Sequence, residues 1–170
     1  MSLIFECIST VSYSILVNGE PKGDIRPSRG IRQGDPLSPY LFLLCSEGLN
    51  RMLQKAAHND QIRGFSLCKN GPKISHLFFA NDSLLFCRAT KSDLQAIQAI
   101  LSLYERASGQ RLNREKTSIF FSKATSEGTS EEISNFLGVS EVKEYATYLG
   151  LPAVVGKNKK ASLRYIKERI

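Results

Sequence analysis

The chain has 170 residues and a formal net charge of +7, from 23 Lys and Arg against 16 Asp and Glu. That length suits one domain or part of a larger one, and a hydrophobic fraction of 42% excludes a wholly disordered or fibrous protein. No apolar run approaches the roughly 18 residues that cross a bilayer, and the N-terminal segment lacks the basic region of a signal peptide. We therefore expect no membrane partner.

The four cysteines are far apart in the sequence and form no Cys-x-x-Cys pair; they are Cys7, Cys45, Cys68 and Cys87. This spacing disfavours a zinc site and a dithiol redox site. We predict four reduced thiols with no disulfide partner, as in an intracellular protein, and the sequence leaves nuclear and cytoplasmic location both open.

The first 35 residues predict two strands followed by a loop. Residues 13–18 have the composition of a β-strand, Asn18 and Gly19 form a tight-turn pair, and a second strand can follow to Ile25. Residues 26–35 hold a proline and two glycines, which is typical of an ordered loop.

A long helix and a β-hairpin are expected next. Ser38 suits the N-cap and Pro39 the first helical position, and apolar residues keep helical spacing to about Ala57. Residues 74–87 hold two apolar runs around a polar tip at 81–83, which indicates a hairpin buried on at least one face.

The second half of the chain predicts further helices and short strands. Thr90 and Asp93 suggest a capping box for a helix over 91–108, which Gly109 would end. The later elements are a strand over 117–122, a short helix capped by Thr129 with Glu132 and closed by Gly138, a strand over 148–151 and a helix over 159–170. The order predicts an α+β fold, in which helices pack on one face of an antiparallel sheet.

The tip of the predicted hairpin is the first candidate site. Two adjacent carboxylates at such a tip, with a third from a neighbouring strand, would hold two divalent metals for phosphoryl transfer. This tip offers one carboxylate, Asp82, and one neutral amide, Asn81. Since Asn-Asp is also ordinary turn chemistry, these residues alone leave a metal site and a plain turn both open.

Four segments resemble motifs of the reverse transcriptases of LINE-type (non-LTR) retrotransposons, in the order and spacing of that family. Residues 29–42 (RGIRQGDPLSPYLF) resemble motif B, and residues 79–82 (FAND) stand where the family carries Phe/Tyr-Ala-Asp-Asp, its motif C. Residues 108–120 resemble motif D and residues 148–152 (YLGLP) motif E, in a style most similar to plant elements. The resemblance implies that residues 1–170 are a fragment of a reverse transcriptase domain, a partial polymerase palm.

The resemblance also implies partners and site residues. The family is an RNA-directed DNA polymerase that uses Mg²⁺, an RNA template, a DNA primer, their RNA–DNA hybrid and deoxynucleotide triphosphates. Template and nucleotide contacts fall on Arg29, Gly30, Arg32, Gln33, Gly34, Phe79 and Ala80. Lys116 would lie near the departing pyrophosphate, and primer contacts fall on Tyr148, Leu149 and Gly150.

Two departures from the family pattern concern the metal ligands. Asn81 occupies the place of the first motif C aspartate, and the motif A aspartate is expected upstream of the first strand, whereas no aspartate precedes Asp24. Two unit charges about 4 Å apart interact by about 4 kcal/mol at an effective dielectric constant of about 20. Loss of one carboxylate charge beside a divalent cation therefore weakens the metal site by several kcal/mol. We therefore expect Asp82 to be a weak metal ligand and this chain to be catalytically inactive.

Two alternatives stay open at this stage. The chain can be a slice of a longer, working polymerase, an interpretation that Asn81 disfavours. It can also be a non-enzymatic nucleic-acid-binding remnant, because its basic residues cluster at Arg26, Arg29 and Arg32 and again over residues 157–169. Ordinary solvated surface charge would explain any one of these residues equally well.

Overall fold

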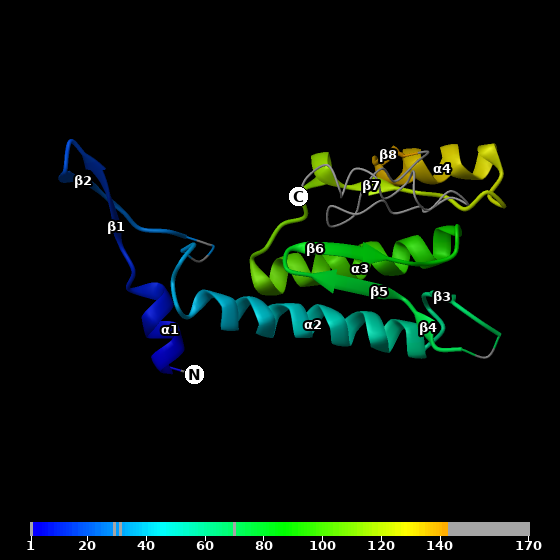
Figure 1. Ribbon diagram of the computed structural model, residues 1–170, viewed down its shortest axis with the longest axis horizontal. Helices are drawn as coiled ribbons and strands as arrows, with labels where there is room; N and C mark the ends of the chain where they lie inside the picture. Colours follow the sequence, from blue (N-terminus) through cyan, green and yellow to red (C-terminus); the bar gives the residue numbers. More distant parts are fainter. Residues whose placement is uncertain (1, 29, 31, 70, 143–170) are drawn as a thin grey trace, which may run out of the picture.

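The computed structural model describes residues 2–28, 30, 32–69 and 71–142 (Figure 1). In chain order the elements are α1 (Ser2–Ser9), β1 (Tyr13–Val17), β2 (Glu20–Ile25), α2 (Ser38–His58), β3 (Phe65–Ser66), β4 (Lys73–Ile74), β5 (His76–Phe79), β6 (Asp82–Leu85), α3 (Lys91–Ser108), the 3₁₀ turn η1 (Arg114–Lys116), β7 (Ser118–Ile119), α4 (Glu127–Leu137) and β8 (Ser140–Glu141).

The α+β class is confirmed, and its sheets are small. The strands pair two by two, as antiparallel β1–β2, β3–β4 and β5–β6 and as parallel β7–β8. Four of these strands, β3, β4, β7 and β8, are only two residues long.

None of the helices in the described part of the chain combines the length and the hydropathy that a membrane-spanning segment needs.

The core forms where α2, α3 and the β5–β6 hairpin meet. Leu53 on α2 is fully buried, and Ile97 on α3 belongs to the same apolar cluster. Phe78 of β5 and Leu85 of β6 pack against this cluster from the hairpin, and Figure 1 shows the hairpin lying along the two helices. Both helices therefore cover one face of the hairpin, which agrees with the expected layer arrangement.

The start of α2 differs by one residue from the prediction. Leu37 is the N-cap residue, Ser38 is already helical, and the Ser38 hydroxyl donates to the carbonyl of Arg32 at 2.8 Å. The Asp35 carboxylate accepts from the backbone N–H of Leu37 at 2.8 Å. Because Asp35 turns the chain ahead of the helix, Ser38 closes the loop instead of capping the helix.

The predicted limits of α3 are confirmed, and the predicted start of α4 is wrong. Thr90 caps α3, and Gly109 ends it in the left-handed conformation with φ of 73°. α4 begins earlier than expected, because the Ser126 side chain accepts from the N–H of Thr129. Thr129 therefore lies inside the first turn, while Gly138 closes the helix as predicted.

Several further predictions can be compared with the structure. The Asn18-Gly19 turn is confirmed, since both residues have positive φ, 53° and 82°. The strand expected over 117–122 shortens to β7, while α1, β3, β4 and β8 had no clear sequence signal. The strand over 148–151 and the helix over 159–170 lie outside the described residues. All four cysteines are free thiols.

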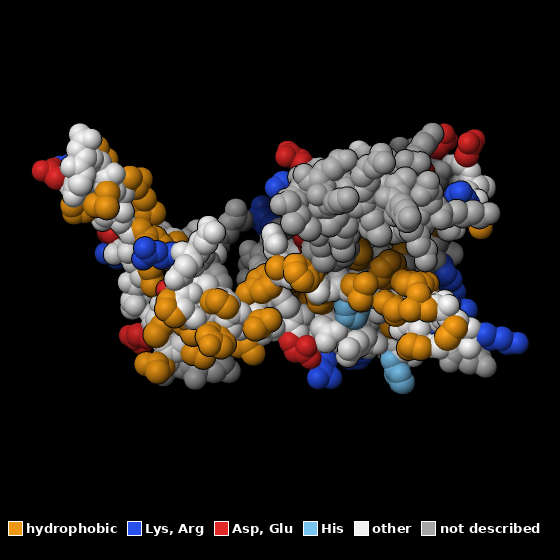
Figure 2. Space-filling model, in the orientation of Figure 1, with side chains coloured by type: hydrophobic (Ala, Val, Ile, Leu, Met, Phe, Trp, Pro, Cys, Tyr) orange, Lys and Arg blue, Asp and Glu red, His pale blue; other side chains and the backbone are white. Residues whose placement is uncertain are grey.

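The N-terminal part of the chain exposes many hydrophobic side chains. Figure 2 shows them gathered over α1 and the N-terminal half of α2. Examples are Leu3 at 76%, Phe5 at 71% and Leu16 at 70% exposure. The apolar pattern of β1 is therefore not used by the core that the described residues form.

Candidate functional site

The tip of the β5–β6 hairpin is a two-residue turn. Phe79 pairs with Asp82 across the strands, so Ala80 and Asn81 form the turn itself. Ala80 has a positive φ of 48°, a conformation that an alanine rarely adopts. Asp82 is the first residue of β6 rather than part of the turn, so the predicted tip at 81–83 is displaced by one residue.

Strand alternation decides which way the tip residues face. Phe78 packs on the core, so its neighbour Phe79 belongs to the opposite face, and Phe79 is 58% exposed. Directly paired residues share a face, which places Asp82 with Phe79 on the side away from α2 and α3. The hairpin therefore presents Asp82 on its open face, with Asn81 beside it in the turn.

The donor set at this tip is a poor match for a pair of divalent cations. Asp82 supplies one carboxylate and Asn81 one neutral amide, whereas Mg²⁺ sites usually combine more than one carboxylate with substrate phosphates. Among residues 2–28, 30, 32–69 and 71–142, no three His, Cys, Asp or Glu side chains are grouped so that they could hold a metal ion. The residues present do not fit a two-metal site.

The loop before α2 carries most of the residues that the sequence predicts to form the motif B loop. Gly30 and Gly34 both have positive φ, 82° and 85°, so these two positions require the conformational freedom of glycine. Arg32 lies with its guanidinium carbon 5.7 Å from the centroid of the Tyr13 ring, which ties the loop to β1 by a cation–π contact. Gln33 is exposed, and Arg29 lies outside the described residues.

Most of the segment predicted to be motif D follows α3. Lys116 is the last residue of η1 and is exposed, while its backbone N–H donates to the Asn113 side chain at 3.2 Å. The carboxylate of Glu105 accepts from the N–H of Leu112 at 2.8 Å and holds this segment against α3. Lys116 is therefore carried on a segment with fixed backbone geometry.

The predicted site residues stand on three separate elements. In Figure 1 the hairpin tip and the C-terminal end of α3 lie at the same end of the helical core, and the motif B loop precedes α2 there. No hydrogen bond or ion pair within the described ranges joins Lys116 to Asp82 or to Arg32. Tyr148, Leu149 and Gly150 lie outside the described residues.

A polar connection that the sequence did not reveal anchors β5 to α2. His76 Nε2 lies 2.7 Å from Asn50 Oδ1, and His76 Nδ1 lies 2.9 Å from the Ser75 hydroxyl. Burial lowers the pKa of His76, which favours the neutral ring at pH 7. The contact spans 26 residues, so no local pattern could have pointed to it.

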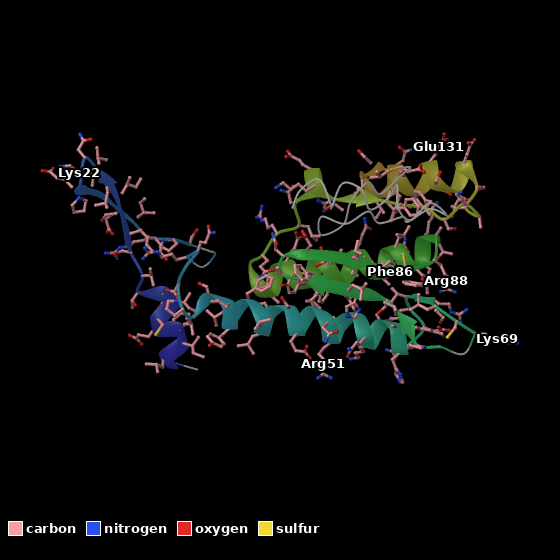
Figure 3. All side chains as sticks on the ribbon, in the orientation of Figure 1. Lys22, Arg51, Lys69, Phe86, Arg88 and Glu131 are labelled. Carbon is pink, nitrogen blue, oxygen red and sulfur yellow. The ribbon has the colours of Figure 1, made fainter. Side chains whose placement is uncertain are left out.

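A buried carboxylate organises the opposite end of the hairpin. Asp93 has no solvent exposure and accepts hydrogen bonds from the Arg88 guanidinium at 2.8 Å and from the Arg63 backbone N–H at 2.9 Å. Burial raises the pKa of Asp93, but hydrogen bonds from Arg88, Arg63 and Thr90 outweigh it and keep the pKa below its ordinary value. Figure 3 shows Arg88 beside the start of α3, where this network fixes the chain.

Comparison with known proteins shows which proteins this chain is similar to. The chain is 35% identical over 127 residues to the Retrovirus-related Pol polyprotein from type-1 retrotransposable element R2 of Popillia japonica. It is 42% identical over 72 residues to the R2 polyprotein of Nasonia vitripennis. It is also 48% identical over 68 residues to an uncharacterized mitochondrial protein of Arabidopsis thaliana.

Each match covers only part of this chain and part of the relative. They cover 75%, 42% and 40% of this chain, against 20%, 6% and 56% of the three relatives in the same order. The chain thus spans well under two thirds of the length of these relatives. The model of the family described as "Reverse transcriptase (RNA-dependent DNA polymerase)" matches residues 2–152. The chain therefore belongs to the reverse transcriptase family, as a fragment related to non-LTR retrotransposon polymerases.

Proposed function

We propose that this chain forms the part of an RNA-directed DNA polymerase palm that holds template and primer, and that it is catalytically inactive as it stands. One observation carries the proposal: the hairpin presents Asp82 on its open face, and an amide, Asn81, stands beside it in the turn. The family uses divalent metal ions and binds a nucleic acid template and primer. An RNA template, a DNA primer and deoxynucleotide triphosphates are the specific partners that we propose. The Mg²⁺ that the resemblance implies is not expected to bind stably to this chain, because Asp82 is the one carboxylate at the tip.

The proposed roles follow the four motifs. Motif B (29–42) would lie along the template and the incoming nucleotide, and motif C (79–82) at the position where the family holds its metals. Lys116 of motif D (108–120) would lie near the departing pyrophosphate, and motif E (148–152) at the primer. The positive φ of Gly30 and Gly34 supports a close approach of the motif B backbone to a ligand. Arg32, Gln33 and Lys116 are exposed, as phosphate or base contacts require.

The missing charge at Asn81 is the reason to expect inactivity. Replacing a carboxylate by an amide removes one negative charge from the position nearest the metals. At about 4 Å from a divalent cation that charge is worth about 2 to 8 kcal/mol, for effective dielectric constants between about 80 and 20. Each 1.36 kcal/mol corresponds to about tenfold in rate, so the loss is roughly thirtyfold to a millionfold from this position alone.

A primer-extension assay tests the proposal. The full chain is incubated with a primed RNA template, Mg²⁺ and labelled deoxynucleotides, and binding of the same primed template is followed by fluorescence anisotropy. We expect binding that weakens as salt rises, without extension of the primer. Magnesium-dependent extension with Asn81 in place would overturn the assigned inactivity, and absence of binding at low salt would overturn the template-holding role.

A further inference from the structure

An open cavity lies between the last turns of α3 and the segment that leads into η1. Its volume is about 690 Å³, which is within the usual range for ligand sites of about 300 to 1,000 Å³. It is lined by Ser102, Glu105, Arg106, Arg111, Leu112, Asn113, Arg114 and Glu115. We call it the α3–η1 pocket.

Three arginines line the α3–η1 pocket without acidic partners. Arg106, Arg111 and Arg114 form no ion pair with any residue in the described part of the chain, whereas Arg51 and Arg63 elsewhere each pair with an acid. Guanidinium groups stay charged at any ordinary pH and present five N–H donors each. With two glutamates in the lining, the three arginines leave the pocket with an excess of positive charge.

Hydrogen bonds hold the pocket in shape before any ligand arrives. Glu105 uses one carboxylate oxygen to accept from the N–H of Leu112 at 2.8 Å. Tyr104 donates its hydroxyl to Gln110 at 2.7 Å, and the N–H of Gly109 donates to the carbonyl of Glu105 at 3.0 Å. Because this backbone is already fixed, a ligand need not order it on binding.

The lining chemistry selects the class of ligand. Among the described residues of the lining, Leu112 is the one apolar side chain, and none is an aromatic side chain that could stack on a base. Arginine forks match phosphate oxygens in a bidentate manner, and an open, polar site suits a chain of phosphates better than an enclosed small molecule. The C-terminal end of α3, which contributes to the lining, lies at the end of the core that carries the hairpin tip (Figure 1).

We propose that the α3–η1 pocket binds the phosphodiester backbone of the nucleic acid held by this chain. The inference rests on the proposed template-holding role and adds the specific contact. Phosphate contacts of this kind position a strand without reading its sequence, so the site should bind different sequences about equally well.

The test compares two double variants with the same change in charge. Arg111→Gln with Arg114→Gln removes two pocket arginines, and Arg51→Gln with Arg63→Gln removes two that pair with Glu47 at 2.6 Å and with Asp60 at 3.3 Å. Figure 3 shows Arg51 on the outer side of α2. All four side chains are partly or largely exposed, so we expect matching circular dichroism spectra from the full chain and both variants.

Binding of a labelled RNA–DNA hybrid is measured by fluorescence anisotropy between about 50 and 200 mM salt. We expect the pocket variant to bind roughly tenfold or more weakly, with the slope of log K against log salt reduced by about two. The control variant should keep the wild-type slope. Equal losses in the two variants, or no loss in the pocket variant, would overturn the proposal.

Competition with inorganic triphosphate shows which phosphates the pocket binds: those of the nucleic-acid backbone or those of a nucleotide triphosphate. If it displaces the hybrid from the wild-type chain at low micromolar concentration, while the pocket variant is insensitive, the pocket serves a triphosphate and the backbone assignment is wrong. Failure of the wild-type chain to bind any hybrid would overturn both this site and the template-holding role. Primer extension with Asn81 in place would instead contradict the assigned inactivity and leave this site standing.

Discussion

Leu53→Ala is expected to lower the free energy of unfolding by about 2 to 5 kcal/mol. Leu53 has no solvent exposure and lies in the cluster with Leu49, Ile62 and Ile97, so the substitution leaves a cavity at the junction of α2, α3 and the hairpin. Urea unfolding followed by circular dichroism measures the change, at chain concentrations where light scattering stays flat.

Leu44→Ala is the matched control for this prediction. Leu44 lies on the same helix and is 66% exposed, so the same substitution should change the free energy of unfolding by less than about 0.5 kcal/mol. Leucine and alanine differ little in helix propensity, which leaves burial as the variable. Similar losses at the two positions would show that α2 is not held by the core described above.

Asp93→Asn is expected to cost about 2 to 4 kcal/mol of unfolding free energy at pH 7. The variant keeps the shape of the side chain, but one of its two oxygens becomes an amide donor that faces the N–H groups of Arg88 and Arg63. The comparison is Asp60→Asn, the same chemical change in an exposed ion pair with Arg63 at 3.3 Å. We expect that control to cost less than about 1 kcal/mol.

The pH dependence of the Asp93 effect has a defined sign. The pKa of Asp93 in the folded chain lies below its ordinary value of 3.8, so the unfolded chain takes up this proton first as the pH falls. The stabilising contribution is therefore complete above about pH 5 and declines below about pH 4. A difference between wild type and Asp93→Asn that grew toward low pH would contradict this account.

Local signals in the sequence predict much of the helical fold. Apolar spacing, Thr90 and Gly109 were enough for α3, because cap and stop both act within a few residues of the helix they bound. The start of α4 was predicted wrongly at Thr129, since Ser126 and Thr129 are both residue types that suit a cap and lie three residues apart. The short ladders β3–β4 and β7–β8 leave no periodicity, because two residues cannot show one.

The candidate site also has features that the sequence predicts and features that it does not. The hairpin around Asn81 and Asp82 could be predicted from the sequence, and the assignment of this tip to motif C stays a prediction. The direction of the tip could not be predicted, because only the contact of Phe78 with the core fixes which face Asp82 occupies. The His76–Asn50 contact and the α3–η1 pocket depend on the packing of helices and loops, which no spacing in the sequence encodes.

Titration with Mn²⁺ tests the central claim, that Asn81 deprives the hairpin of a metal site. Binding to the full chain is measured by electron paramagnetic resonance of free Mn²⁺, for wild type and for Asn81→Asp. We predict no tight site in the wild type, and an affinity at least about fivefold higher in the variant, because a second carboxylate is placed next to Asp82. A wild-type chain that binds Mn²⁺ at its hairpin as tightly as Asn81→Asp would contradict the account.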